Sequence, residues 1–154
     1  MRWSIILAGI WMLYSCQTDV LYTETIEIPN ASWVDSQKLS FEFDVEDSTV
    51  LYQLVVNLKH SVEYAYENLY VNIRTVYPNG KIIEDPLSLE MADHAGRWFG
   101  QCNSKTCTLN IMLQEKALFR PKGHYQIIFE PYMREQPIKG IHSIGLSVER
   151  VESE

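Results

Sequence analysis

The segment Leu39-Ser40-Phe41-Glu42-Phe43-Asp44-Val45 carries the clearest structural signal in this chain of 154 residues. Apolar residues occupy every second position, and polar or charged residues fill the positions between them. In an extended strand, this period of two places the apolar side chains on one face and the polar ones on the other. Residues 39–45 are therefore predicted to form a strand with one face in a core and the other in water.

The same alternation recurs in both directions from this segment. It is clear in residues 69–74, 108–113, 125–130 and 144–149, and weaker in residues 21–28, 82–91 and 97–102. Residues 50–58 fit helical spacing as well as alternation, and their β-branched Val50, Val55 and Val56 favour a strand. The chain is thus predicted to contain eight or nine short strands.

Turn signals such as Pro78-Asn79-Gly80 separate these strands, and no long amphipathic helix lies between them. A parallel α/β fold needs crossover helices, which this sequence does not provide. We therefore expect one all-β domain that folds as an antiparallel two-sheet β-sandwich. The jelly roll is one topology of such a sandwich that fits this number of strands.

The N-terminus has the layout of a secretory signal, with Arg2 as the only charge before an apolar run from Ile5 to Leu13. This run is shorter than the about 20 residues that a membrane-spanning helix needs. Leu13-Tyr14-Ser15-Cys16 resembles a bacterial lipobox, which implies cleavage before Cys16 and acylation of that cysteine with fatty chains such as palmitate. The alternative is a plain secreted protein that discards Cys16 with its signal.

The predicted organisation is a signal peptide at 1–15, a lipidated Cys16 with a tether that extends to residue 25, and a β-sandwich domain at 26–154. Lys and Arg number 13 against 20 Asp and Glu, for a net charge of −7. An acidic domain repels phosphate, which argues against nucleic acid as a partner and against a basic patch that docks on anionic lipid. Membrane attachment is therefore expected to come from the lipid on Cys16.

Cys102 and Cys107 are predicted to form a disulfide across a hairpin, because the four residues between them are polar turn formers. Closing so short a loop stabilises the fold by only about 2 kcal/mol. Half of a metal site is the alternative, but the chain has no second pair of cysteines and no histidine close in sequence. We expect no metal and no cofactor.

The chain shows no nucleophile elbow, P-loop or dinucleotide-binding turn. Four acidic residues gather at Glu84, Asp85, Glu90 and Asp93, where they could form turns, bind calcium or, with a histidine, catalyse hydrolysis. Turns are favoured, since Asp85 precedes Pro86 and Asp93 lies near Gly96. No catalytic residues are assigned, and the protein is not expected to be an enzyme.

Aromatic residues gather in residues 64–70 and 97–99. We select Trp98, Arg97 and Tyr70 as a candidate interaction patch, because aromatic and arginine side chains anchor protein interfaces. Exposed aromatics on a sandwich could instead bind glycans, and aromatics also fill cores. If Leu69, Val71 and Ile73 face inward, at least one tyrosine of residues 64–70 faces solvent.

Several motifs, in this order, resemble those of the gliding-motility lipoprotein family GldH. They are the lipobox at Cys16, Tyr66-Glu67-Asn68-Leu69-Tyr70, Pro78-Asn79-Gly80, the D-x-x-G-x-W-x-G pattern in Asp93-His94-Ala95-Gly96-Arg97-Trp98-Phe99-Gly100, Gly123-His124-Tyr125, Tyr132-Met133-Arg134, Gly140-Ile141 and Ser143-Ile144-Gly145-Leu146. The Cys102 and Cys107 pair is not part of this pattern.

The resemblance implies a non-catalytic lipoprotein of the Bacteroidota cell envelope, at the outer membrane and facing the periplasm. Its expected partners are other envelope lipoproteins or proteins of the gliding-motility and protein-secretion apparatus, which it would meet through protein–protein contacts. A glycan-binding module on a surface lipoprotein is the alternative function.

Overall fold

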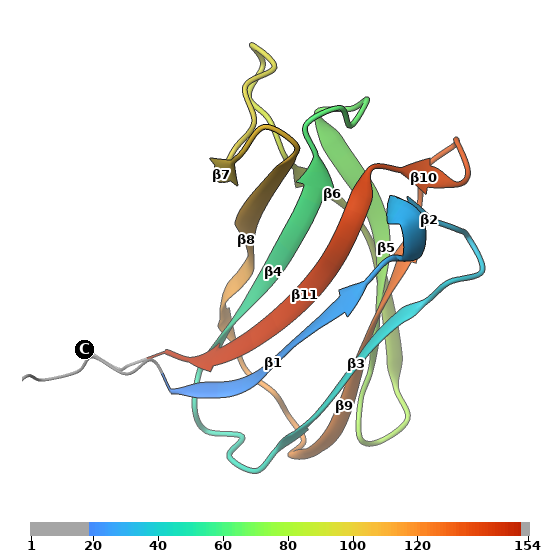
Figure 1. The fold of residues 1–154 in the computed structure, drawn as a ribbon. Helices are drawn as coiled ribbons and strands as arrows, with labels where there is room; N and C mark the ends of the chain where they lie inside the picture. Colours follow the sequence, from blue (N-terminus) through green and yellow to red (C-terminus); the bar gives the residue numbers. More distant parts are fainter. Residues whose placement is uncertain (1–18, 152–154) are drawn as a thin grey trace, which may run out of the picture.

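A computed structural model describes residues 19–151, which form two antiparallel sheets packed face to face (Figure 1). The first sheet has the order β1 (Val20–Glu27), β11 (Ile141–Arg150), β4 (Tyr52–Ser61), β8 (Thr106–Ala117) and β7 (Gln101–Cys102). The second sheet has the order β3 (Leu39–Val45), β9 (Gly123–Pro131), β5 (Asn68–Val76) and β6 (Ile82–Glu90). A ribbon of β2 (Ser32–Trp33) and β10 (Ile138–Lys139) follows the short 3-10 helix η1 (Pro29–Ala31). The predicted two-sheet sandwich is confirmed.

The eight long strands pair in nested order. β5 pairs with β6, β4 with β8, β3 with β9 and β1 with β11, so the first half of the chain runs antiparallel to the second half. Successive pairs alternate between the two sheets. This is the arrangement of a long hairpin rolled over on itself, which is the jelly roll.

The core forms where the alternating apolar positions of the two sheets meet. In β3 the side chains of Leu39, Phe41, Phe43 and Val45 are all buried, as their spacing predicts. Residues 52–58 alternate in the same way within β4, so the strand interpretation of residues 50–58 is confirmed and the helical one is wrong.

Two predicted boundaries are wrong. β1 begins at Val20 and pairs with β11, which confirms the weak strand predicted at residues 21–28, so residues 20–25 are sheet rather than tether. The Tyr22 ring holds this edge strand by packing against Phe43 at 5.3 Å between centroids. Residues 97–102 become a strand only at Gln101–Cys102, because Gly100 has φ +80°, outside the extended region. The predicted signal at 1–15 and Cys16 lie outside the described residues.

The registers define two ends of the sandwich. At the first, Asp19 leads into β1 and its carbonyl accepts a hydrogen bond from Arg150, while β4 starts beside the last residues of β8. We call this the entry end, and it lies near the C label in Figure 1. The opposite, distal end holds the loops that follow β4, β6 and β9.

Between residues 19 and 151, no helix is long and apolar enough to cross a membrane.

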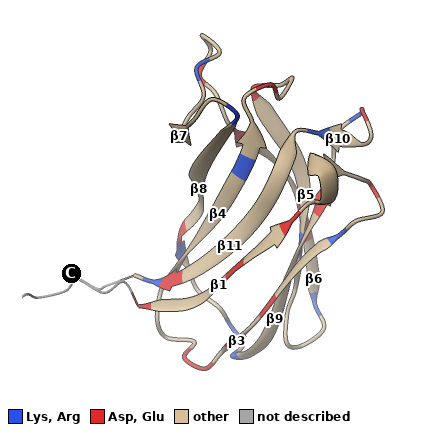
Figure 2. Ribbon diagram, viewed as in Figure 1, with Lys and Arg blue, Asp and Glu red and all other residues tan. Residues whose placement is uncertain are grey.

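Charged residues of both signs are interspersed over the sandwich (Figure 2). On the outer face of the second sheet they form a cross-strand network, in which Glu130 lies 2.6 Å from Lys38 and 3.9 Å from Arg74. The hydrogen bond from Lys38 is the main reason why the pKa of Glu130 lies below its ordinary value. The acidic excess of the chain is therefore partly compensated on this face.

His60 is a polar side chain with no exposed surface, at the distal end of β4. Its Nδ1 lies 2.9 Å from the Ser61 carbonyl oxygen, so Nδ1 carries the hydrogen and donates it. Its Nε2 has no hydrogen-bond partner within the described part of the chain, and its ring lies 4.5 Å from the Trp98 ring. Burial lowers the pKa of His60, and the nearby His142 lowers it further.

This buried histidine should make folding stability depend on pH. Because the folded state resists protonation of His60, the unfolded state takes up the proton first once the pH falls below about 6.5. The contribution is full above that pH, and is lost below it by at most about 1.4 kcal/mol per pH unit. Urea unfolding of the His60→Phe variant between pH 8 and pH 5 should show a flatter decline than the parent. The exposed His94→Gln serves as control, and equal slopes for all three proteins would contradict the prediction.

Candidate interaction groove

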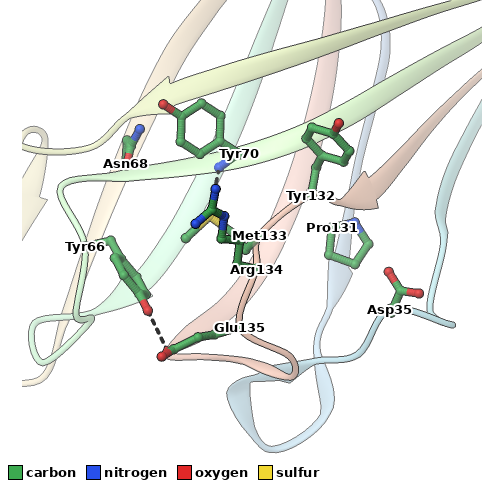
Figure 3. Close-up of a pocket in the computed structure, with 9 residues that line it drawn as sticks. All are labelled: Asp35, Tyr66, Asn68, Tyr70, Pro131, Tyr132, Met133, Arg134 and Glu135. Atoms are coloured by element: carbon green, nitrogen blue, oxygen red, sulfur yellow. Dashed lines mark hydrogen bonds between the residues drawn. The ribbon is translucent and has the colours of Figure 1, made fainter.

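A groove of about 780 Å³ opens at the distal end, on the outer face of the second sheet (Figure 3). Tyrosines from β5, from the segment before it and from the loop after β9 dominate its lining. The lining residues are Asp35, Tyr66, Asn68, Tyr70, Pro131, Tyr132, Met133, Arg134 and Glu135. We call this site the tyrosine groove.

Tyr70 and Tyr132 form its floor because of the strand period. Leu69 and Val71 are fully buried, so Tyr70 between them must point outward. The Tyr132 N–H donates to the Tyr70 carbonyl at 3.0 Å, which continues the pairing of β5 with β9 by one residue. The two rings thus belong to a cross-strand pair and are 46% and 62% exposed, an apolar surface open to a partner. At least one tyrosine was predicted to face solvent, and Tyr70 confirms this.

The loop after β9 is tied to β5 and to the segment before it. The Tyr66 hydroxyl donates to Glu135 at 2.6 Å, and this hydrogen bond raises the pKa of Tyr66 (Figure 3). The Tyr70 N–H donates to the Met133 sulfur at 3.5 Å. The Tyr66 ring also packs on Tyr64, with centroids 5.7 Å apart. These contacts order the groove before any partner binds, which lowers the entropic cost of binding.

The polar groups of the groove differ in their engagement. Arg134 is exposed, and none of the ion pairs found within residues 19–151 involves it. A free guanidinium beside two exposed tyrosines can bind a carboxylate while the rings take an apolar or aromatic group. Asp35 and Glu135 supply hydrogen-bond acceptors at the rim.

Of the predicted patch, only Tyr70 lines this groove. Arg97 lies on the loop after β6, where its Nε donates to Asp93 at 2.7 Å. The other Asp93 oxygen accepts the backbone N–H groups of Ala95 and Arg97, each at 2.9 Å. These bonds hold the pKa of Asp93 below its ordinary value. Asp93 therefore has the predicted turn role, and Arg97 serves the same turn.

Trp98 closes the distal end of the core. It is half-buried, forms an isolated bridge with Ala92 and packs on His60 and Tyr64. Tyr64 also contacts Tyr66, so Trp98 reaches the tyrosine groove only through the intervening ring of Tyr64. Sequence reasoning missed Asp35, Tyr132, Arg134 and Glu135 as groove residues. The Tyr132-Met133-Arg134 motif was the one available signal, but nothing in it pointed to Tyr70.

The cysteines and the acidic residues occupy other places. Cys102 and Cys107 are joined by a disulfide in the β7–β8 hairpin, whose turn Asn103 holds by accepting the N–H groups of Lys105 and Thr106. Glu84 pairs with Arg74 at 2.8 Å. In the described residues, no three His, Cys, Asp or Glu side chains are grouped so that they could hold a metal ion.

Two glycines of the Asp93–Gly100 loop should differ sharply in tolerance. Both have positive φ, but a Cβ on Gly96 would meet nothing, whereas one on Gly100 would lie 2.2 Å from the Thr108 carbonyl oxygen. Gly96→Ala should cost about 1 kcal/mol from backbone strain alone. Gly100→Ala adds a backbone clash and should cost about 3 kcal/mol or more. Thermal or urea unfolding measures both, and equal costs would contradict this account of the loop.

Solved structures with some likeness are much larger and only distantly similar. Dimeric latent PorU from Porphyromonas gingivalis overlaps 88% of this chain with 14% of its own, at 10% identity and a TM-score of 0.36. An uncharacterized protein of Listeria monocytogenes, lmo2446, overlaps 86% of this chain with 11% of its own, at 17% identity and a TM-score of 0.34. Likeness at this level carries no argument about function.

Two curated relatives match over nearly their full length. A "Gliding motility lipoprotein GldH homolog" of Christiangramia forsetii is 28% identical over 95% of this chain and 93% of its own. The "Gliding motility lipoprotein GldH" of Flavobacterium johnsoniae is 28% identical over 95% of this chain and 94% of its own. Residues 20–148, which include almost the whole sandwich, match the GldH lipoprotein family. The chain therefore belongs to the GldH family of gliding-motility lipoproteins, which are lipid-anchored in the cell envelope.

Proposed function

We propose that this protein is a non-catalytic component or accessory of a gliding-motility and protein-secretion apparatus, and that the tyrosine groove is its contact site. The single observation that carries the contact site is the exposed pair Tyr70 and Tyr132 beside the free Arg134. Tyrosine and arginine are the residues that most often anchor protein interfaces. The groove is also ordered by bonds within the protein, as a recognition site should be.

The position of the groove supports the same role. It lies at the distal end, away from Asp19, where the chain enters the sandwich. With acyl chains on Cys16, the groove would face the compartment rather than the lipid. We place that anchor in the outer membrane, with the domain in the periplasm, where other envelope lipoproteins and motility or secretion proteins can reach it.

Removal of the groove aromatics should strongly weaken partner capture. The variant Tyr70→Ala/Tyr132→Ala should recover about tenfold less of its motility or secretion partners in cross-linked detergent extracts, since anchor residues contribute about 2 kcal/mol or more. Both side chains are exposed, so stability should change by no more than about 0.5 kcal/mol each.

Phe99→Ala is the matched control, because Phe99 is 45% exposed and lies outside the groove. It should leave partner recovery unchanged. A parent protein that captures no motility or secretion component would count against the proposed function. Capture that survives the double variant, or fails equally in the control, would count against the groove as its site.

Glycan binding is the second candidate, favoured by the same exposed rings next to hydrogen-bonding Asp35 and Asn68. Sugars stack on aromatic faces while their hydroxyls bond to such groups. A glycan array probed with the parent and with Tyr70→Ala/Tyr132→Ala separates the two functions. Binding that the double variant loses would favour the glycan-binding module over the protein contact.

Acylation of Cys16 is the second part of the proposal. Metabolic labelling with an alkyne palmitate should mark the parent protein and leave Cys16→Ser unmarked. Cys102→Ser/Cys107→Ser is the matched control and should keep the label, because those sulfurs are joined to each other. An unlabelled parent, or a label that persists in Cys16→Ser, would contradict lipidation at this residue.

A further inference from the structure

An exposed apolar row crosses the entry end of the first sheet. Leu51 precedes Tyr52 and Leu118 follows Ala117. Because Tyr52 and Ala117 are paired in antiparallel strands, the two leucines oppose each other one step beyond the ladder. The Val151 N–H donates to the Leu51 carbonyl at 2.9 Å, which places Val151 on the other side of Leu51. Leu51 is 38% exposed and Leu118 is 42% exposed.

The row is held in place rather than carried on free loops. The Arg120 guanidinium donates to the Ser48 carbonyl at 3.3 Å, which joins the loop before β4 to the loop after β8. Tyr52 and Ala117, next to the row, are buried and paired. Val20 adds a further side chain that is 44% exposed, at the start of β1. Exposed apolar side chains grouped in this way indicate a surface that contacts something apolar.

The covalent anchor determines what that contact is. Only Gln17 and Thr18 separate Cys16 from Asp19, which is bonded to Arg150 at the same end of the sheet. Three residue steps span at most about 11 Å. A lipid on Cys16 would therefore hold the entry end within about that distance of the headgroup layer.

We propose that Leu51, Leu118 and Val20 rest in the interfacial layer of the lipid bilayer, so that the sandwich stands on its entry end. This deepens the proposed function and rests on its lipidated Cys16. β4 has ten residues, so the distal end would lie about 30 Å from the lipid surface. The tyrosine groove would then be presented at a fixed height and orientation to partners in the same membrane.

The charges at this end indicate an apolar contact rather than an electrostatic one. Lys116, Arg120 and Lys122 are exposed there, together with Glu115 and Glu46. Arg150 is paired with Asp19 at 3.2 Å. With both signs present, attraction to anionic lipid largely cancels, so the contact should form on zwitterionic lipid and persist in high salt.

Tryptophan fluorescence in vesicles with brominated acyl chains tests this orientation. After removal of residues 1–15, the chain keeps only Trp33 and Trp98, both at the distal end. We expect lower emission from the acylated variants Leu118→Trp and Leu51→Trp in phosphatidylethanolamine vesicles whose acyl chains carry bromine close to the headgroups. Phe99→Trp, matched in exposure but distal, should lose none, and nor should the parent.

Flotation of the same vesicles separates the two proposals. If the protein floats but Leu118→Trp and Leu51→Trp keep the same emission as Phe99→Trp, the proposed bilayer contact is overturned. The lipid anchor on Cys16 is not affected by that result. Protein that does not float would overturn the anchor and the contact together. Quenching that disappears once other envelope proteins are added would assign the row to a protein partner instead, and would also overturn the proposal.

Discussion

The closure of the sandwich depends on the contacts of the Phe43 ring. Phe43 lies on β3 in the second sheet, yet its ring contacts Tyr22 of β1 in the first sheet at 5.3 Å and Phe119, in the loop after β8, at 5.5 Å. It also stacks on Tyr125 of the neighbouring β9 at 6.1 Å. Nested strand pairing alone would leave two separate sheets, each with a bare apolar face. Aromatic side chains are long enough to meet across the gap, and their burial holds the sheets together.

This closure leaves two ends of the sandwich that are built differently. The aromatic cluster around Phe43 lies in the core towards the entry end, where Phe119 directly follows the exposed Leu118. The distal end is sealed differently, by Trp98 packed on the buried His60. Because both ends are closed by core residues, the loops at the distal end are free to carry polar and aromatic groups for recognition. In the proposed function, the jelly roll is the rigid support that separates membrane attachment from partner contact.

The motif residues that resemble those of the family mainly stabilise the sandwich. In the Asp93–Gly100 loop, Asp93 holds the turn, Trp98 covers the core and Gly100 passes against the backbone of β8. A tryptophan and an arginine next to each other suggested recognition, but the structure uses both to build one loop. The proposed contact site instead uses the outward-facing Tyr70 and Tyr132. The role of a residue depends on the face of the sheet that it occupies. The residue type alone does not show which face that is.

The sequence by itself determined the local structure: alternation predicted the strands, their buried faces and hence the two-sheet fold, because the period of a strand depends only on neighbouring residues. It also indicated that at least one tyrosine of residues 64–70 faces solvent. It indicated a weak strand at residues 21–28 yet extended the tether to residue 25, because the local pattern cannot show that β1 pairs with β11, more than 100 residues away. The tyrosine groove was hidden for the same reason, since Tyr66 and Glu135 are separated by 69 residues. Only the tertiary structure decided which loops meet, because the nested pairing brings distant segments to one end.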